Sequence, residues 1–195
     1  MNIFVPMTTI RLTKEFSFEA AHALDGYDGP CREIHGHSYR LFVTVKGTPG
    51  EDPRDPKYGM VMDFGLLKRI VNEEVVSRFD HALVLRASAS GDALRRLLAD
   101  RFGNIVAVDY QPTCENMLAD FARRIAARLP QGVRLHSLRL NETATSFAEW
   151  FAEDNGCSPP LFRKNATSHD EKTLSGRCLC IDIQVLLCLS GASDA

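Results

Sequence analysis

The residues best suited to chemistry lie in one short stretch near the N-terminus, Cys31 to His37, with a further histidine upstream at His22. The stretch is Cys-Arg-Glu-Ile-His-Gly-His, so His35 and His37 are two residues apart. On a β-strand this spacing places both side chains on one face, because successive side chains alternate. Three imidazole nitrogens leave a fourth position open on a tetrahedral zinc ion, which is typical of a catalytic site. We therefore expect these histidines to bind a metal.

Simpler interpretations exist for these residues. A single histidine on an apolar face is more often a core residue with one satisfied nitrogen. Three inward-facing histidines favour a metal, since each buried donor or acceptor without a partner costs about 1–3 kcal/mol. Cys31 has three open interpretations: a plain loop residue, a fourth ligand that closes the site, or a thiol with a lowered pKa that acts as base or nucleophile.

Further candidates lie downstream, and each also has a structural explanation. Asp80 and His81 either end a helix, where a histidine suits the dipole, or form an acid–base pair in which the carboxylate orients the imidazole. Glu142 follows an apolar strand and is either a surface carboxylate or a group that grips a planar, guanidine-like edge through two hydrogen bonds. Thr113 and Glu115 most simply begin a helix.

The elements that must position these residues alternate between strand and helix patterns. Period-two alternation and short apolar runs predict strands over residues 10–22, 35–45, 105–108, 133–140 and 147–151. Apolar stripes at helical spacing predict helices over 64–79 after an Asp63 cap, over 92–102 before Gly103, and from Thr113 to 129. This order predicts an α+β fold with helices packed on one face of an antiparallel sheet.

Composition limits the class of protein and its location. The chain has 195 residues, 45% of them hydrophobic, and a net charge of −2, which predicts neither a nucleic acid nor a membrane partner. It contains no apolar run of membrane-spanning length, and residues 1–11 lack the features of a signal peptide. We expect a cytoplasmic location in which the cysteines are free thiols. Residues 155–195 fit no element, and we expect a poorly ordered C-terminal extension after a domain over 1–154.

Six motifs together resemble one family. They are Phe-Glu-Ala-Ala-His (18–22), Cys-x-x-x-His-Gly-His (31–37), Gly-Met-Val-Met-Asp-Phe (59–64), Asp-His (80–81), Pro-Thr-x-Glu-Asn (112–116) and Glu-Thr (142–143). Their types and order resemble the 6-pyruvoyltetrahydropterin synthase superfamily over about residues 10–153. The cysteine spacing is similar to that of the bacterial branch, the 6-carboxytetrahydropterin synthases of queuosine biosynthesis.

The resemblance implies a tunnelling fold (T-fold) with a four-stranded antiparallel sheet. It also implies trimers that stack into a homohexamer, with active sites between subunits. The roles implied for individual residues are zinc ligands at His22, His35 and His37, a catalytic thiol at Cys31, acid–base partners at Asp80 and His81, a pterin anchor at Glu142, and pocket-lining residues at Thr113 and Glu115.

The implied reaction converts 7,8-dihydroneopterin triphosphate to 6-carboxy-5,6,7,8-tetrahydropterin, acetaldehyde and triphosphate, with zinc as the cofactor and without a nicotinamide. One alternative keeps the fold but leaves the side chain intact, as in a 6-pyruvoyltetrahydropterin synthase. The other is a non-catalytic protein that binds zinc and pterin. The chain departs from the family pattern at Cys114, at Phe147 in place of a common tyrosine, and in a long insertion over 86–108.

Overall fold

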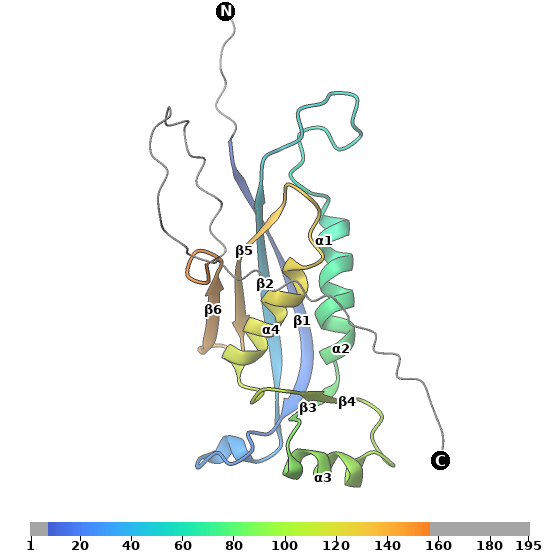
Figure 1. Ribbon diagram of the computed structural model, residues 1–195, viewed down its shortest axis with the longest axis vertical. Helices are drawn as coiled ribbons and strands as arrows, with labels where there is room; N and C mark the ends of the chain where they lie inside the picture. Colours follow the sequence, from blue (N-terminus) through green and yellow to red (C-terminus); the bar gives the residue numbers. More distant parts are fainter. Residues whose placement is uncertain (1–7, 157–195) are drawn as a thin grey trace, which may run out of the picture. The chain divides into compact units, whose positions relative to one another are not determined.

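A long hairpin forms the centre of the fold (Figure 1). In the computed structural model, which describes residues 8–156, strand β1 (Ile10–His22) pairs antiparallel with β2 (His35–Gly47). The register sets Ile10 opposite Gly47 at one end and His22 opposite His35 at the other. Both strands were predicted from their alternation, and the register brings the predicted metal ligands together at the closed end of the hairpin.

The remaining strands extend this hairpin on both sides. On one side β5 (Arg134–Asn141) pairs with β2, and β6 (Phe147–Phe151) pairs with β5, both antiparallel. On the other side the short strands β3 (Ala82–Arg86) and β4 (Ile105–Val108) run parallel to β1, giving the order β4-β3-β1-β2-β5-β6. The expected four-stranded antiparallel sheet is therefore present, with two parallel strands added at one edge.

Strand β3 was not predicted, although Ala-Leu-Val-Leu-Arg is a short apolar run of the kind that buried parallel strands show. It pairs only with Ala20, Ala21 and His22 of β1. The first part of β1 therefore has no partner on that side among the described residues.

The helices lie where the sequence placed them, with one shift. A continuous helical segment comprises α1 (Phe64–Val71), a π-helical stretch (Asn72–Val76) and α2 (Ser77–Phe79), and Asp63 caps it by accepting from the Gly65 amide at 2.5 Å. Helix α4 (Cys114–Ala126) is capped by Thr113, as predicted. Helix α3 (Ala89–Leu98) begins earlier than expected, because Ser88 accepts a hydrogen bond from the Gly91 amide at 3.1 Å.

Alternation along β1 and β2 separates two faces of the sheet. The inward face carries the buried side chains Phe16 and Phe18 of β1 and Leu41 and Val43 of β2. These pack against α1, α2 and α4, which cover that face in Figure 1. Each such side chain stabilises the fold by about 1.5–3 kcal/mol through removal from water. The outward face carries polar and charged residues, so only one face of the sheet forms the core.

Several expectations fall beyond the described residues. The predicted boundary at residue 154 lies near their end, and the predicted C-terminal extension over 155–195 lies almost wholly outside them. Among residues 8–156, Cys31 and Cys114 are free thiols, as expected. No helix in this part of the chain is long and apolar enough to cross a membrane.

Candidate metal and catalytic site

Three imidazoles converge at the closed end of the β1–β2 hairpin. His22 ends β1, while His35 and His37 begin β2, and their possible ligand nitrogens all lie within 4.8 Å of one another. His22 is only 3% exposed and lies on the inward face in line with Ala20. The alternation of the two strands therefore directs all three rings to one point, as the sequence predicted.

Backbone carbonyls fix how two of these rings are protonated. His22 Nδ1 lies 2.6 Å from the Pro112 carbonyl oxygen, and His35 Nδ1 lies 2.8 Å from the Glu33 carbonyl oxygen. A carbonyl only accepts, so both Nδ1 atoms carry protons and the neutral rings expose lone pairs on Nε2. These two Nε2 atoms face each other at 3.0 Å. Two lone pairs at that separation repel unless a cation lies beside them.

The third ring adds a nitrogen without a partner. His37 Nε2 is buried and has no hydrogen-bond partner among the described residues. Burial lowers the pKa of both His22 and His37, which favours the neutral imidazoles that metals bind. Metal–nitrogen bonds of about 2.0–2.1 Å at tetrahedral angles separate ligand nitrogens by about 3.3 Å. The three nitrogens thus fit a metal ion of the kind that imidazoles prefer.

Glu142 lies beside this triad at the end of β5. Its Oε1 atom is 3.7 Å from Nε2 of both His22 and His37 and accepts a hydrogen bond from the Tyr39 hydroxyl at 3.4 Å. Tyr39 occupies the position after His37 on the same face of β2 and is 1% exposed. Sequence reasoning did not select it, although its period-two spacing from the histidines was the available signal. A carboxylate held in this way can accept two hydrogen bonds from a ligand near the metal.

Cys31 is close in sequence to the triad but is not part of the ligand cluster. It lies half-buried in a short 3₁₀ turn, Pro30–Arg32, in the loop between β1 and β2. Among the described residues, the group able to hold a metal contains the three histidines and does not include this thiol. The geometry therefore favours a role other than a fourth ligand.

Asp80 and His81 form a pair, but not at the triad. His81 Nδ1 lies 3.0 Å from Asp80 Oδ1, and the same oxygen accepts from the Glu19 amide at 3.0 Å. That amide, with the adjacent imidazole, holds the pKa of the Asp80 carboxyl below its usual range. His81 has a φ of 57°, a left-handed conformation that is uncommon outside glycine, and its amide donates to the Glu19 carbonyl at 2.6 Å.

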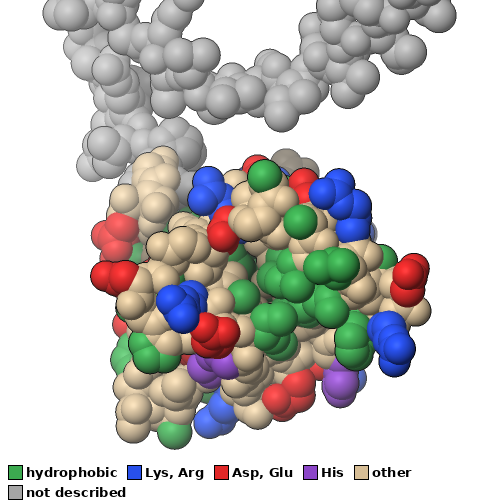
Figure 2. All heavy atoms as spheres, turned by 90° about the horizontal axis from the view of Figure 1, so that it is seen from below, with side chains coloured by type: hydrophobic (Ala, Val, Ile, Leu, Met, Phe, Trp, Pro, Cys, Tyr) green, Lys and Arg blue, Asp and Glu red, His purple; other side chains and the backbone are tan. Residues whose placement is uncertain are grey.

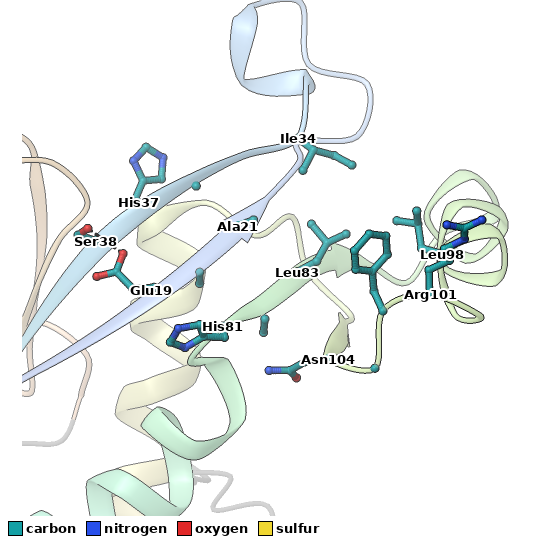
Figure 3. A pocket seen from close by; sticks show the side chains of 15 residues that line it. Glu19, Ala21, Ile34, His37, Ser38, His81, Leu83, Leu98, Arg101 and Asn104 are labelled. Carbon is teal, nitrogen blue, oxygen red and sulfur yellow. Dashed lines mark hydrogen bonds between the residues drawn. The ribbon is translucent and has the colours of Figure 1, made fainter.

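His81 faces a pocket on the other side of the sheet from the triad (Figure 3). The pocket has a volume of about 770 Å³; its lining includes Glu19 and Ser38, which point outward, and also His37. His37 precedes Ser38 in β2 and therefore points to the opposite face, as Figure 3 shows. One chain thus brings the triad and Glu142 together, and it holds the Asp80–His81 pair apart from them.

The remaining sequence candidates, Thr113 and Glu115, lie at the start of α4. Thr113 caps α4, and Glu115 is exposed in its first turn. The Pro112 carbonyl, a group that sequence reasoning did not consider, orients His22. Cys114 belongs to the core, where burial raises the pKa of its thiol to about 12. The Arg139 guanidinium lies over the Phe147 ring, with its Cζ atom 3.6 Å from the ring centre.

A sheet covered by helices on one face, with three imidazoles at the end of its central hairpin, defines a T-fold protein with a candidate metal centre. The chain belongs to the 6-pyruvoyl tetrahydropterin synthase family, whose model matches residues 11–153. This confirms the resemblance carried by the six motifs.

Individual relatives agree with this membership. The chain is 38% identical to a 6-carboxy-5,6,7,8-tetrahydropterin synthase of Haemophilus influenzae, over 72% of this chain and 97% of that protein. It is 37% identical to a protein of the same name from Synechocystis, over 71% of this chain and 91% of that protein. The structure of Caenorhabditis elegans 6-pyruvoyl tetrahydropterin synthase shares the fold, with a TM-score of 0.54 at 21% identity over 74% of this chain and 96% of that one.

Proposed function

We propose that this protein is a zinc-dependent lyase. Its substrate is 7,8-dihydroneopterin triphosphate, and with one water it yields 6-carboxy-5,6,7,8-tetrahydropterin, acetaldehyde and triphosphate. The observation that carries the proposal is the convergence of three imidazoles beside the partly exposed carboxylate of Glu142, in a chain whose curated relatives bear this enzyme name. Both parts are needed, because a metal triad alone serves many reactions.

Zinc, when bound, supplies a Lewis acid that polarises the substrate's side-chain hydroxyls. The chain's own residues then bind the substrate and move its protons. Glu142 accepts hydrogen bonds from the amino-pyrimidine edge of the pterin, with Tyr39 fixing one carboxylate oxygen. Thr113 and Glu115, next to the carbonyl that orients His22, line this pterin pocket.

Proton transfer is assigned to three residues. Cys31 removes a proton from the side-chain carbons as a thiolate and returns it as the thiol that this transfer forms. Asp80 orients the His81 imidazole, which serves as the acid–base partner of that thiol. Because His81 faces the far side of the sheet from the triad, the proposal requires Asp80 and His81 to come from a second subunit.

The strand edges support such an assembly. β6 has a free edge, and β3 leaves the first part of β1 uncovered on one side, among the described residues. Exposed edges of this kind pair readily with other strands. Closure of the sheets of three chains into a ring, and stacking of two rings, gives the homohexamer included in this proposal.

We assign the reaction to the cytoplasm and to queuosine biosynthesis. A pterin triphosphate carries too much charge to cross a membrane unaided, so the enzyme that consumes it is expected where it is made. The queuosine assignment follows the enzyme name borne by the relatives and stands or falls with the product.

A product assay on the purified chain tests the proposal. The protein is incubated with 7,8-dihydroneopterin triphosphate, products are identified by mass spectrometry, and metals are measured on the same sample. We expect 6-carboxytetrahydropterin, acetaldehyde and about one zinc per chain. A product that keeps its three-carbon side chain would identify a 6-pyruvoyltetrahydropterin synthase instead. Binding of zinc and pterin without turnover would identify a non-catalytic protein.

A further inference from the structure

The loop that carries Cys31 is closed on itself. It spans residues 23–34 between β1 and β2, and the Leu24 amide donates to the Cys31 carbonyl oxygen at 3.0 Å. Gly26 has a φ of +73°, a conformation that favours glycine, and it makes the turn that lets the loop fold back. Asp25 follows Leu24, whose amide is hydrogen-bonded to the Cys31 carbonyl. Contacts that fix the position of Asp25 therefore also restrict the position of the Cys31 backbone.

Asp25 fastens this loop to the beginning of α3. Its Oδ2 atom accepts hydrogen bonds from the hydroxyls of Ser88 at 2.8 Å and Ser90 at 2.7 Å. Hydrogen bonds from Ser90 and Ser88 lower the pKa of the Asp25 carboxyl, so it is ionised at neutral pH and both contacts are charge-assisted. The loop and the helix are more than 60 residues apart in sequence.

The backbone of Asp25 is fastened to a second segment. Its carbonyl oxygen accepts from Gln111 Nε2 at 2.8 Å. Gln111 is in turn held by the Thr113 amide, which donates to its carbonyl at 2.7 Å. Between them lies Pro112, whose carbonyl orients His22. Asp25 therefore joins the Cys31 loop to the segment that positions one of the three histidines.

Helix α3 makes little contact with the core. None of its residues is buried, and Leu97 is 78% exposed. Its first turn approaches the end of β3 closely, since a Cβ on Gly91 would lie 2.1 Å from the Arg86 carbonyl oxygen. Figure 2 views the end of the molecule that carries α3 and shows apolar side chains gathered in the middle of that face. Within the insertion over 86–108, Val106 and Val108 of β4 belong to the core, whereas α3 contributes no buried residue to it.

We propose that Asp25 is a positioning residue that fixes the position of Cys31 by fastening its loop to Ser88 and Ser90 of the insertion and to Gln111. The insertion thus contacts the Cys31 loop and also contributes residues such as Leu98 and Asn104 to the lining of the pocket that His81 faces. The catalytic consequence rests on the proposed function, in which Cys31 transfers protons. The consequence for the reactivity of the Cys31 thiol does not, since it follows from the contacts alone.

The experiment compares full-length wild type with Asp25→Ala, Asp25→Asn, Ser90→Ala, Ser90→Thr and the double variant of Asp25→Ala with Ser90→Ala. Asp28→Ala is the matched control, because Asp28 is an exposed carboxylate of the same loop without a hydrogen bond or ion pair among the described residues. The rate of Cys31 alkylation by iodoacetamide is measured by peptide mass spectrometry, which separates it from the other thiols. Bound zinc, kcat, KM and the unfolding midpoint are measured on each protein.

We expect Asp25→Ala to change the Cys31 alkylation rate by about 3-fold or more and to lower kcat by about 10- to 100-fold, the size of effect that a misplacement near 1 Å produces. KM and bound zinc stay near wild type, and Asp28→Ala matches wild type. Ser90→Ala should change the alkylation rate and kcat in the same direction but less, and Ser90→Thr, which keeps the hydroxyl, should behave like wild type. The double variant should be no worse than Asp25→Ala, because the two substitutions remove the same hydrogen bond.

The proposal would be overturned if Asp25→Ala had the alkylation rate and kcat of the wild type. It would also be overturned if the effects of Asp25→Ala and Ser90→Ala simply added in the double variant. If Asp25→Ala does not fold, Asp25→Asn and the two Ser90 variants decide by the same criteria. If wild type gives no pterin product, the proposed function fails, while the alkylation rates still test the positioning of Cys31.

Discussion

The Nε2 atoms of His22 and His35 face each other at 3.0 Å while both Nδ1 atoms point at backbone carbonyls. Neither ring can donate to the other in its neutral form, so this contact stabilises the fold only when a cation lies between or beside the two nitrogens. The native hairpin is therefore more stable when a positive charge lies beside these two nitrogens at its closed end. Metal binding and folding stability should be linked here.

Removal of the metal should lower thermal stability. A ligand that binds only the native state, at a free concentration 100 to 1,000 times its Kd, raises the free energy of unfolding by about 2.7–4.1 kcal/mol. In a chain of this size each kcal/mol shifts the unfolding midpoint by about 2–4 °C. Calorimetry of the metal-loaded protein with and without a chelator should show this loss, and added Zn²⁺ should reverse it. His35→Ala should bind less metal and lose most of the chelator effect.

His136→Ala is the matched control for that variant. His136 lies on β5, away from the ligand cluster, with its ring against Phe151. It should keep full metal content and the full response to chelator. A chelator that leaves the midpoint of the wild type unchanged would contradict the link between the triad and stability.

Cys31→Ala should abolish turnover and keep the metal. Loss of a group that transfers protons costs about 100- to 10,000-fold in rate. Metal content should remain near one per chain, because the thiol is outside the ligand cluster. Cys114→Ala should retain turnover, since that thiol is buried and its raised pKa keeps it protonated. Metal analysis beside kinetics checks both, and loss of metal in Cys31→Ala would make Cys31 a ligand.

Glu142→Gln should weaken pterin binding specifically. The amide presents a donor where the pterin edge needs acceptors, and a hydrogen bond to a charged group contributes about 1.5–3 kcal/mol. We expect kcat/KM to fall by about 10- to 150-fold, mostly through KM, while metal content stays unchanged. Calorimetric titration with neopterin checks the binding step. Equal affinity for neopterin in both proteins would remove Glu142 from the pterin site.

Much of this site was predictable because it is built on strand alternation. The positions of His22, His35 and His37 on one face followed from period two alone, and the caps at Asp63 and Thr113 followed from their residue types. These features are local, so a single sequence determines them.

Other features depend on contacts between distant segments. The start of α3 was misplaced because Ser88-Ala-Ser-Gly has the composition of a turn, and it becomes a capped helix only against the end of β3. The partner of His22 is a backbone carbonyl at Pro112, which no residue type signals. The separation of His81 from the triad depends on the pairing of β3 with β1, a strand that the sequence pattern did not single out.

Gly91→Ala should destabilise the protein although alanine is the better helix former. In an open helix this change would stabilise by about 1 kcal/mol. Here the new Cβ would meet the Arg86 carbonyl oxygen at 2.1 Å, so the first turn of α3 must move. A lower unfolding midpoint should result. Gly103→Ala, with nothing within 4 Å of its Cβ position, is the control and should change the midpoint little.

Asp120 should make stability depend on pH in the acid range. Its side chain is 2% exposed on α4; burial alone would raise its pKa, but hydrogen bonds from Arg124 and Tyr110 outweigh that effect and lower it. A lowered carboxyl pKa gives stability that is complete above the unfolded value near 3.8 and is lost as pH falls through the folded value. Asp120→Asn should therefore cost about 1–3 kcal/mol at neutral pH, with the difference from wild type shrinking only below about pH 4. Urea unfolding at pH 7, 5 and 3 measures this.

Asp92→Asn is the control. It breaks an exposed pair with Arg95 and should cost less than about 0.5 kcal/mol. Equal costs for the two variants would show that burial of Asp120 contributes nothing.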